Sequence, residues 1–318
     1  MRIAVITRHA IINYGSLLQA MATQQLLKSV GEDCEIIDYI REDESYRNQE
    51  KTLLKGKPSF SNNFFKRIAY LALRQPESII AGKRFAKMRK TYLNTTKLYS
   101  DIEQMQNDKP QADIYMTGSD QVWGPVMDGT YDSAYCLSFT ADCDRRIAFA
   151  ASFGRTKLTQ ETEAFYKKWL SRYAAIAVRE DSAVQLLNSW GLQAKQAIDP
   201  TLMLDTTYWN KFTTEAKKKY ILVYQIHNDK KLDRYAKAVA KRTGLPLVRV
   251  SASFHQIIRG GKFKFCPDIG EFLSYIKNAQ CLITDSFHGT ALALTFNTPF
   301  VEVLPGETST RNMSILRL

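Results

Sequence analysis

The stretch CLITDSFHGTALALTF, residues 281–296, decides the fold class of this chain. Residues 281–284 form an apolar, β-branched run that predicts a buried strand. Residues 289–296 are almost wholly apolar and predict a helix that is buried on every side. A short turn, residues 285–288, joins the two. Strand, turn and helix in this order form the repeating unit of α/β proteins.

The same alternation of apolar runs and amphipathic stretches continues outward along the chain. The expected strands are residues 2–7, 35–40, 113–117, 146–150, 174–178, 220–226, 246–250, 281–284 and 300–304, and the expected helices are 16–30, 159–172, 182–190, 231–243, 270–277 and 289–296. A polar, lysine-rich connector, residues 206–219, separates two such sets. We therefore expect two Rossmann-like, doubly wound units, residues 1–205 and 206–318, that face each other across a ligand-binding cleft.

The chain has 318 residues and a formal net charge of +12, most of which lies in one segment. Residues 41–100 contain 14 Lys or Arg and 5 Asp or Glu, a net charge of +9. Their apolar residues recur at helical spacing, which predicts basic amphipathic helices inserted in the first unit. Such a face is either the solvated side of packed helices or a surface that rests on anionic lipid or a phosphate-bearing substrate. Nucleic acid is not expected, because no nucleic-acid-binding motif is present.

The cysteines and histidines exclude further classes. The five cysteines are scattered without a CxxC pair and the four histidines are far apart, so neither a metal site nor a disulfide framework is expected. No run approaches the ~20 apolar residues of a membrane-spanning helix, and the N-terminus lacks the pattern of a signal peptide. We expect a cytoplasmic protein, peripheral at the inner face of the membrane if the basic segment docks there.

Three loops that directly follow expected strands carry candidate site residues. The first, NYGS at residues 13–16, opens a helix. Gly15 would let the backbone approach a ligand, and the free N–H groups of the helix start favour an anion. The alternative is that Ser16 only caps the helix.

The second loop is TGSDQVWG, residues 117–124. Asp120 and Gln121 offer a carboxylate and an amide that can read sugar hydroxyls, and Asp120 can also act as a general base. In the alternative interpretation, Asp120 caps the following turn and Trp123 fills the core.

The third loop, TDSFHGT at residues 284–290, joins the buried strand to the apolar helix. His288 at this junction could reach into a cleft, with the helix start at Ser286, Gly289 and Thr290 behind it to stabilise a phosphate. The alternative is that His288 is only structural, as a lone histidine usually is. The other three histidines have no comparable context.

Arg179 follows another expected strand, in the sequence AVREDS. Its rigid guanidinium suits a two-point clamp on a carboxylate or phosphate. The alternative is a surface ion pair with Glu180 or Asp181.

Together these segments resemble the polysaccharide pyruvyl transferase family. The matching segments are NYGSLLQA (13–20), GSDQVW (118–123), AVREDS (177–182), AIDPTLML (197–204), TDSFHGTALAL (284–294) and NTPFVEV (297–303). The resemblance implies a fold like that of GT-B glycosyltransferases. It also implies transfer of the enolpyruvyl group of phosphoenolpyruvate, a co-substrate, onto a sugar of a lipid-linked polysaccharide precursor as a cyclic ketal, as in exopolysaccharide or capsule biosynthesis. No cofactor is implied.

The resemblance also assigns roles. His288 matches the essential histidine of the family and Arg179 its donor-binding arginine. Ser286, Gly289 and Thr290 would complete the donor site, and Asp120 would be the acceptor-side base. The acceptor would also contact Asn13, Tyr14, Gly15 and Gln121.

Two departures from the family pattern keep alternatives open. Several members have an arginine where this chain has Ser286, so Arg311, Lys262 or Arg259 would have to replace that phosphate ligand. Members also continue beyond the sequence RNMSILRL with another helix or two. The alternatives are a GT-B-like glycosyltransferase that uses a nucleotide sugar, or a non-catalytic module that binds glycan or a lipid surface. The acceptor sugar, its bridged hydroxyls and the oligomeric state do not follow from the sequence.

Overall fold

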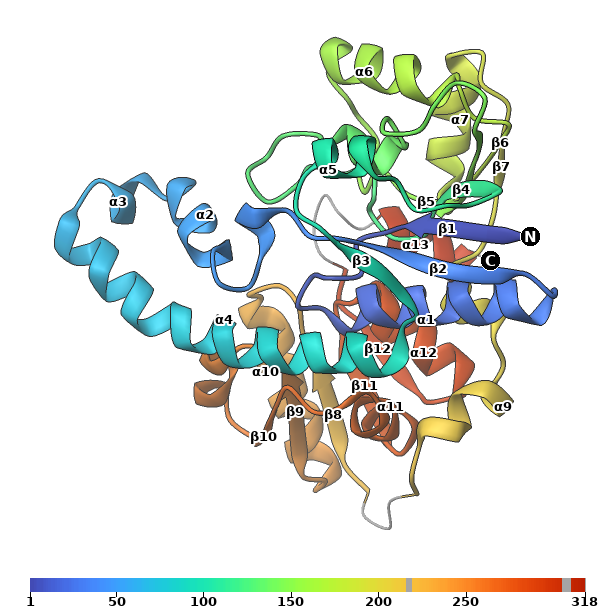
Figure 1. The fold of residues 1–318 in the computed structure, drawn as a ribbon. Coiled ribbons are helices and arrows are strands. Elements are labelled where there is room, and N and C mark those ends of the chain that lie inside the picture. The colour runs from blue at the N-terminus through green and yellow to red at the C-terminus, as the bar shows by residue number, and fades with distance from the viewer. Residues whose placement is uncertain (216–218, 305–309, 318) are drawn as a thin grey trace. The chain divides into compact units, whose positions relative to one another are not determined.

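The computed structural model describes residues 1–215, 219–304 and 310–317 of the chain (Figure 1). Contacts divide the chain into two compact units. The first comprises Met1–Ile12 and Ser16–Pro200, and the second comprises Asn13–Gly15 and Thr201–Leu318. The division thus falls after Pro200 rather than after residue 205, and three residues near the N-terminus pack with the second unit.

The first unit is built on a seven-stranded sheet in the order β3-β2-β1-β4-β5-β6-β7, with every neighbouring pair parallel. The strands are β1 (Arg2–Ile6), β2 (Asp33–Tyr39), β3 (Thr95–Tyr99), β4 (Ile114–Thr117), β5 (Arg145–Ala151), β6 (Ala175–Val178) and β7 (Ala194–Gln196). The sequence predicts the five inner strands but neither edge strand. Edge strands β3 and β7 are polar and largely accessible, so they lack the apolar run on which the prediction depends.

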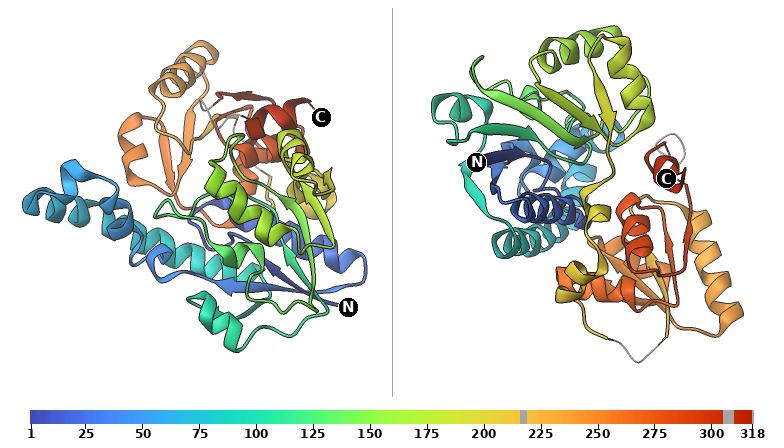
Figure 2. Two further views of the ribbon diagram at one scale, coloured as in Figure 1. Left: turned by 90° about the horizontal axis from the view of Figure 1, so that it is seen from above. Right: turned by 90° about the vertical axis from the view of Figure 1, so that its right-hand side faces the viewer.

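Most helices of this unit lie beside the sheet, and two short ones lie farther out (Figure 2). The helices are α1 (Tyr14–Ser29), α2 (Gln49–Lys55), α3 (Pro58–Ser61), α4 (Phe64–Tyr92), α5 (Ile102–Asn107), α6 (Gln160–Leu170) and α7 (Asp181–Ser189), with short 3-10 turns η1 (Glu42–Glu44) and η2 (Ser133–Cys136). One core cluster centres on the fully buried Trp123, whose indole packs against Phe153 and Tyr166. Trp123 therefore fills the core, as one of the two interpretations of its loop predicts.

The second unit contains a five-stranded parallel sheet in the order β10-β9-β8-β11-β12. Its elements are α8 (Pro200–Met203), α9 (Thr206–Trp209), η3 (Asn210–Phe212), β8 (Ile221–Tyr224), α10 (Lys230–Thr243), β9 (Leu247–Ser251), η4 (Phe254–Arg259), β10 (Lys262–Phe265), α11 (Ile269–Lys277), β11 (Cys281–Thr284), α12 (Phe287–Thr295), β12 (Phe300–Glu302) and α13 (Thr310–Arg317). The expected α/β class with two Rossmann-like units is confirmed.

Residues 281–296 fold as predicted, except that the helix begins earlier than expected. Strand β11 has the expected bounds, and α12 begins at Phe287, two residues earlier than the apolar run indicated. The reason is that the side chain of Ser286 accepts a hydrogen bond from the Gly289 N–H and caps the helix. The expected connector is also partly helical, because Trp209 of α9 is fully buried; residues 216–218 of it lie outside the described residues.

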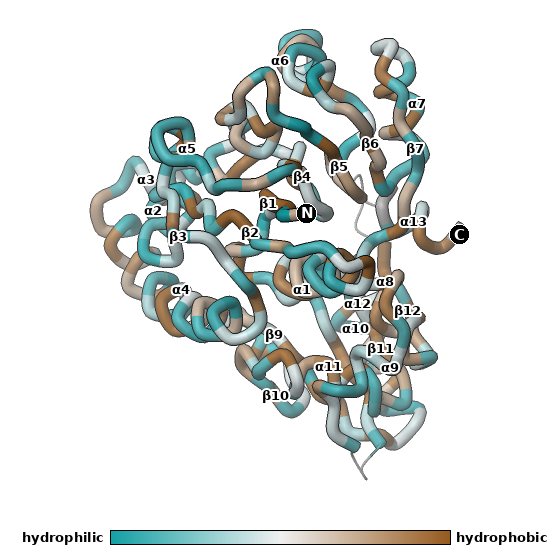
Figure 3. Tube along the Cα trace, turned by 45° about the vertical axis from the view of Figure 1, so that its right-hand side comes forward, coloured by the Kyte–Doolittle hydropathy of each residue, from teal (hydrophilic) through white to brown (hydrophobic). Residues whose placement is uncertain are grey.

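The basic segment of the first unit forms the long helix α4, whose two halves differ. The C-terminal half is anchored by buried residues, among them Phe85 and Met88. The N-terminal half is exposed, and with α2 and α3 it extends away from the sheet (Figures 1 and 2). Coloured by hydropathy, α4 alternates between polar and apolar positions (Figure 3). Within the described ranges, no helix is long and apolar enough to cross a bilayer.

Candidate active site

In the first unit, polar side chains gather at the carboxyl ends of β1 and β4, neighbours at the point where the strand order reverses. Such a switch point is where open α/β sheets bind ligands. The Thr7 hydroxyl donates to the Ser119 carbonyl oxygen over 2.8 Å and fixes the loop after β4. The Ser16 hydroxyl donates to Oδ2 of Asp120 over 2.7 Å. Ser16 therefore orients the carboxylate that the sequence singled out.

The backbone of Asp120 is unusual. Its φ angle is +76°, in the left-handed region that residues other than glycine rarely adopt, and it forms an isolated parallel bridge with Ala151. Its side chain is buried. Strained backbone at a buried polar residue often accompanies a functional site, where the surrounding structure holds one geometry. This observation distinguishes Asp120 from an ordinary turn-capping residue.

Arg179, at the end of β6, is buried among three carboxylates. Its Nη1 lies 2.7 Å from Oδ2 of Asp199, its Nη2 lies 3.6 Å from Oδ1 of Asp120, and its Nε lies 3.9 Å from Oε1 of Glu180. Burial alone would lower the pKa of Arg179, but the three carboxylates raise it, so the guanidinium stays charged. The sequence predicted either an open clamp or a surface pair; the structure has a buried ion cluster.

Asp199 also belongs to this cluster, although the loop motifs after the expected strands do not single it out. It accepts hydrogen bonds from both the Ser119 hydroxyl, over 2.9 Å, and Arg179. Asp199 lies in the segment AIDPTLML, which contributes to the family resemblance, but the resemblance assigns no role to this carboxylate. Gln121, by contrast, lies against Gly154, where an added Cβ would come within 2.6 Å of the Gln121 amide nitrogen.

In the second unit, Tyr14 is a packing residue. Its ring stacks on Phe272, with centroids 4.0 Å apart and planes 3° from parallel. Its hydroxyl donates to the Pro267 carbonyl oxygen over 2.5 Å, and burial raises its pKa well above the ordinary value. Asn13 accepts a hydrogen bond from the Gly15 N–H over 2.8 Å, which shapes the turn that starts α1.

Gly15 and His288 belong to the same unit and are in direct contact. A Cβ built on Gly15 would overlap Nδ1 of the His288 imidazole. The ring of His288 is also in edge contact with Phe287, and the residue is only 5% exposed. The structure therefore brings these two predicted residues together, and it explains why position 15 has no side chain.

The start of α12 depends on small residues at fixed positions. The Ser286 N–H donates to the Thr284 hydroxyl over 3.0 Å, and Ser286 caps the helix. A Cβ on Gly289 would lie 2.6 Å from that same hydroxyl, and Thr290 is fully buried. Ser286 thus has a structural role at this position that an arginine side chain could not fill.

A second histidine of this unit, His227, has no distinguishing context in the sequence. It lies three residues after the end of β8, and its Nδ1 is 3.2 Å from Oδ2 of Asp285, directly after β11. The backbone N–H groups of Ile226 and His227 also donate to that carboxylate, over 2.7 and 2.9 Å. The result is an Asp–His dyad on neighbouring strands, with the histidine half-exposed. Strand pairing between β8 and β11, which short sequence motifs do not show, creates it.

The three residues proposed to replace the missing arginine differ in setting. Arg259 is bound to Asp233 over 2.6 Å and to the amides of Gln225 and Asn228. Lys262 is exposed on β10. The side chain of Arg311 lies outside the part of the chain that the structure describes. Across the described ranges, no group of three or more histidine, cysteine or acidic side chains could hold a metal.

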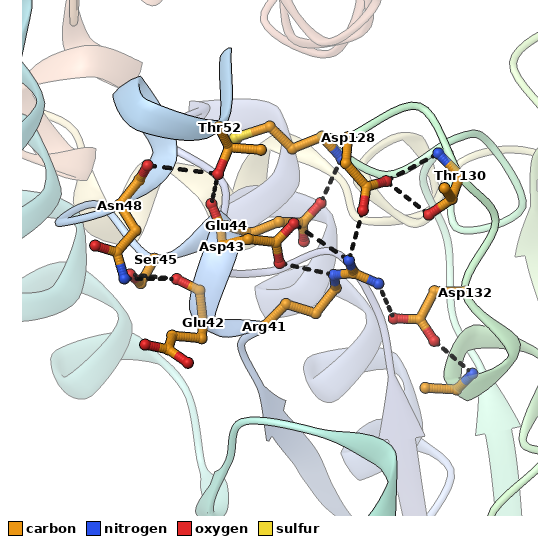
Figure 4. A network of polar contacts seen from close by, with 12 residues as sticks. Arg41, Glu42, Asp43, Glu44, Ser45, Asn48, Thr52, Asp128, Thr130 and Asp132 are labelled. Atoms are coloured by element: carbon orange, nitrogen blue, oxygen red, sulfur yellow. Dashed lines mark hydrogen bonds and ion pairs between the residues drawn. The ribbon is translucent and has the colours of Figure 1, made fainter. Parts of the chain in front are cut away.

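A polar pocket of about 650 Å³ lies in the first unit, at the carboxyl ends of β2 and β3. It is lined by Tyr39, Arg41, Glu42, Asp43, Asn48, Lys51, Thr52, Lys55, Ser100, Asp101, Ile102 and Asp132. Arg41 is held by Asp43 over 2.9 Å, Asp128 over 2.9 Å and Asp132 over 3.2 Å (Figure 4). The lining therefore combines fixed donors and acceptors, with nearly balanced charge.

A sequence model of the polysaccharide pyruvyl transferase family matches residues 13–305, nearly the whole chain. Comparison with curated proteins gives no match. Among solved structures, an α-glucosyltransferase in complex with UDP is similar with 10% identity and a TM-score of 0.52, over 95% of this chain and 80% of that one. UDP-GlcNAc 2-epimerase from Neisseria meningitidis, bound to UDP-GlcNAc, is similar with 12% identity and a TM-score of 0.51, over 100% and 91%. These likenesses show that the fold is of the GT-B type.

Proposed function

Because the chain belongs to the polysaccharide pyruvyl transferase family and is a transferase, we propose that it transfers the enolpyruvyl group of phosphoenolpyruvate to a sugar of a lipid-linked polysaccharide precursor. A proton adds to C3 of the donor, and a first sugar hydroxyl attacks C2. A second hydroxyl of the same sugar then attacks C2 as phosphate leaves. The product is a cyclic ketal with a methyl group and a carboxylate, and the two hydroxyl protons balance those gained by C3 and by phosphate.

The proposed donor site is supported by the buried contact of His288, at the start of α12, with Gly15. A histidine fixed in this way is held in one position, as a general acid requires. The start of a helix also favours the negative charge of a phosphate. We assign His288 the proton transfer to C3 or to the leaving phosphate, with Ser286, Gly289 and Thr290 shaping the phosphate end of the site.

On the acceptor side, the buried and strained Asp120 supports its assignment as the base that takes the proton of a sugar hydroxyl. Arg179 has three carboxylates around it, which leaves the cluster with an excess of negative charge. An anionic donor would be repelled by that excess. We therefore assign Arg179 to positioning Asp120 and Asp199, rather than to gripping the donor as the resemblance implies.

The pocket beside Arg41 supports a further assignment for the acceptor. Its lining holds three cations and four carboxylates together with amide and hydroxyl groups, which suits a neutral, polyhydroxylated ligand better than a polyanion. It lies at the same edge of the sheet as Asp120, two strands further along. We assign it to a sugar of the acceptor that does not itself react.

The reaction is tested by phosphate release from phosphoenolpyruvate with galactose- and mannosamine-bearing acceptors, and by mass spectrometry for the ketal. Thermal stabilisation by phosphoenolpyruvate alone checks donor binding. Stabilisation by nucleoside diphosphates but not by phosphoenolpyruvate would instead support a glycosyltransferase. Absence of both turnover across the acceptor panel and donor stabilisation would refute the proposal.

A further inference from the structure

We propose that residues 57–76, which we call the arm, dock the protein on an anionic lipid bilayer. The arm comprises α3 and the N-terminal half of α4 and belongs wholly to the first unit. Three features of the arm support this docking: its exposed apolar side chains, its charge and its rigid base.

The apolar side chains of the arm are exposed to a degree that packing does not explain. Between residues 57 and 69, every residue except Ser61 is exposed. The large apolar side chains concerned are Phe65 (79% exposed), Leu73 (76%), Phe64 (60%), Ile68 (50%) and Phe60 (42%). Phe64, Phe65 and Ile68 lie within little more than one turn of α4 and are therefore neighbours on its surface, and a group of large exposed apolar side chains marks an interaction surface.

The charge of the arm has a single sign. Residues 57–76 contain four Lys or Arg and no Asp or Glu. The cations lie next to aromatic rings: Nζ of Lys57 is 4.6 Å from the centre of the Tyr70 ring, and the Arg67 guanidinium is 5.6 Å from that of Phe64. Basic groups beside aromatic and aliphatic ones are the composition of helices that lie in the interface of an anionic membrane.

The arm has a fixed base, which prevents its apolar face from folding back. The buried carboxylate of Glu50 in α2 accepts hydrogen bonds from the Tyr70 hydroxyl over 2.9 Å and from the Ser78 hydroxyl over 2.6 Å. Gly82 of α4 packs so closely on Tyr46 that a Cβ there would overlap the tyrosine ring. The Arg41 network then ties the preceding turn, η1, to the loop of Asp128 and Asp132 (Figure 4).

The remaining basic residues of α4 belong to a different surface. Lys83, Lys87 and Lys90 are exposed, but the apolar residues between them, Phe85 and Met88, are buried in the unit. This half of α4 is therefore the solvated face of a packed helix, and it offers a matched control for charge alone. A second copy of the chain is a poorer partner than lipid, because two arms of the same charge would repel each other.

The experiment is co-sedimentation of the full chain with vesicles of phosphatidylcholine, with and without phosphatidylglycerol. We expect binding to the anionic vesicles, weakened in about 1 M salt, where the screening length is only about 3 Å. The variant Phe64→Ser/Phe65→Ser/Ile68→Ser should bind at least about 10-fold more weakly, because it loses the inserted groups. Leu98→Ser/Ile258→Ser, which removes exposed apolar groups elsewhere, should bind like the wild type.

Charge is tested in parallel. Lys57→Gln/Lys66→Gln/Arg67→Gln should weaken binding to anionic vesicles much more than Lys83→Gln/Lys87→Gln/Lys90→Gln, although both remove three cations. Each of three results would overturn the proposal. The two charge variants would weaken binding equally, the apolar variant would bind like the wild type, or the wild type would not bind. A dimer in solution that the apolar variant dissociates would also overturn it. Vesicle binding needs neither donor nor acceptor, so its failure is separate from failure of the proposed reaction.

Discussion

The imidazole of His288 occupies the space that a side chain at residue 15 would need, so glycine at this position and histidine in α12 are fitted to each other. The contact joins Gly15 to the first turn of α12, and both belong to the second unit. Replacing Gly15 is therefore a way to move His288 without removing it.

We expect Gly15→Ala to lower kcat by about 100-fold, because a displacement of about 1 Å at a reacting group has an effect of that order. The thermal midpoint should fall only modestly, since the residue lies at the helix start. His288→Gln should lower kcat by about 10²–10⁴-fold, as removal of a positioned acid does. Wild-type turnover of Gly15→Ala would show that the position of the ring does not matter.

Asp120 and Ser16 form the corresponding pair in the first unit. Asp120→Asn removes the proposed base but keeps the shape of the side chain, so we expect kcat to fall by about 10²–10⁴-fold. Ser16→Ala leaves the base but removes the hydrogen bond that orients it, and should have a smaller effect. Steady-state kinetics of both variants against the same acceptor measure this order; a larger loss in Ser16→Ala would contradict the assignment of Asp120.

Arg179→Leu would leave the carboxylates of Asp120, Glu180 and Asp199 buried without their cation. Removing one partner of a buried ion pair costs about 3–5 kcal/mol, and we expect a loss of that size in the free energy of unfolding of the first unit. The deficit should shrink as the pH falls, because protonation removes the repulsion among the carboxylates. Arg2→Leu, which breaks an exposed pair with Glu35, serves as the control and should cost about 0–1 kcal/mol.

The dyad of His227 and Asp285 offers a second proton-transfer group. We expect His227→Gln to lower kcat by about 10²-fold or more, as loss of a proton-transfer group does, whereas His255→Gln should leave kcat unchanged. Asp285 also fixes the loop after β8 through two N–H groups, so the test uses the histidine rather than the carboxylate. Wild-type kcat in His227→Gln would assign the dyad to structure alone.

The pocket beside Arg41 predicts a dependence on acceptor length. Lys51→Met keeps most of the side-chain volume but removes the ammonium group, whose hydrogen bond to a sugar is worth about 1.5 kcal/mol or more. We expect KM for an oligosaccharide acceptor to rise about tenfold, with KM for a single-sugar acceptor unchanged. Equal changes for both acceptors would place the effect elsewhere.

The sequence predicts structural features that depend on residues close together in the chain. It does not predict features that combine residues far apart in the chain. Strand β11 and helix α12 were evident because burial on all sides leaves an uninterrupted apolar run. Edge strands β3 and β7 were missed because half of their surface is solvated. The loops after the expected strands singled out Asp120, Arg179 and His288 as candidates, but a loop motif does not show that three carboxylates surround the arginine or that His227 contacts Asp285.

Only the structure distinguishes the two interpretations of the basic segment, a solvated face of packed helices or a docking surface. Phe85 and Phe65 each have a lysine and an arginine as close sequence neighbours: Lys83 and Arg84 precede Phe85, and Lys66 and Arg67 follow Phe65. Phe85 is fully buried because it faces the interior of the first unit, whereas the side chain of Phe65 is 79% exposed. Helical periodicity finds both phenylalanines and cannot separate them.

Helix α4 has 29 residues, which at 1.5 Å per residue gives a length of about 44 Å. Residues 64–75, which belong to the arm, account for about 18 Å of that length, and α4 continues from them as the same helix into its packed half. If the arm lies in the interface of a bilayer, the packed half of α4 fixes the tilt of the first-unit sheet relative to the membrane plane. The carboxyl ends of β1 and β4 would then face lipid-linked glycans from one constant direction.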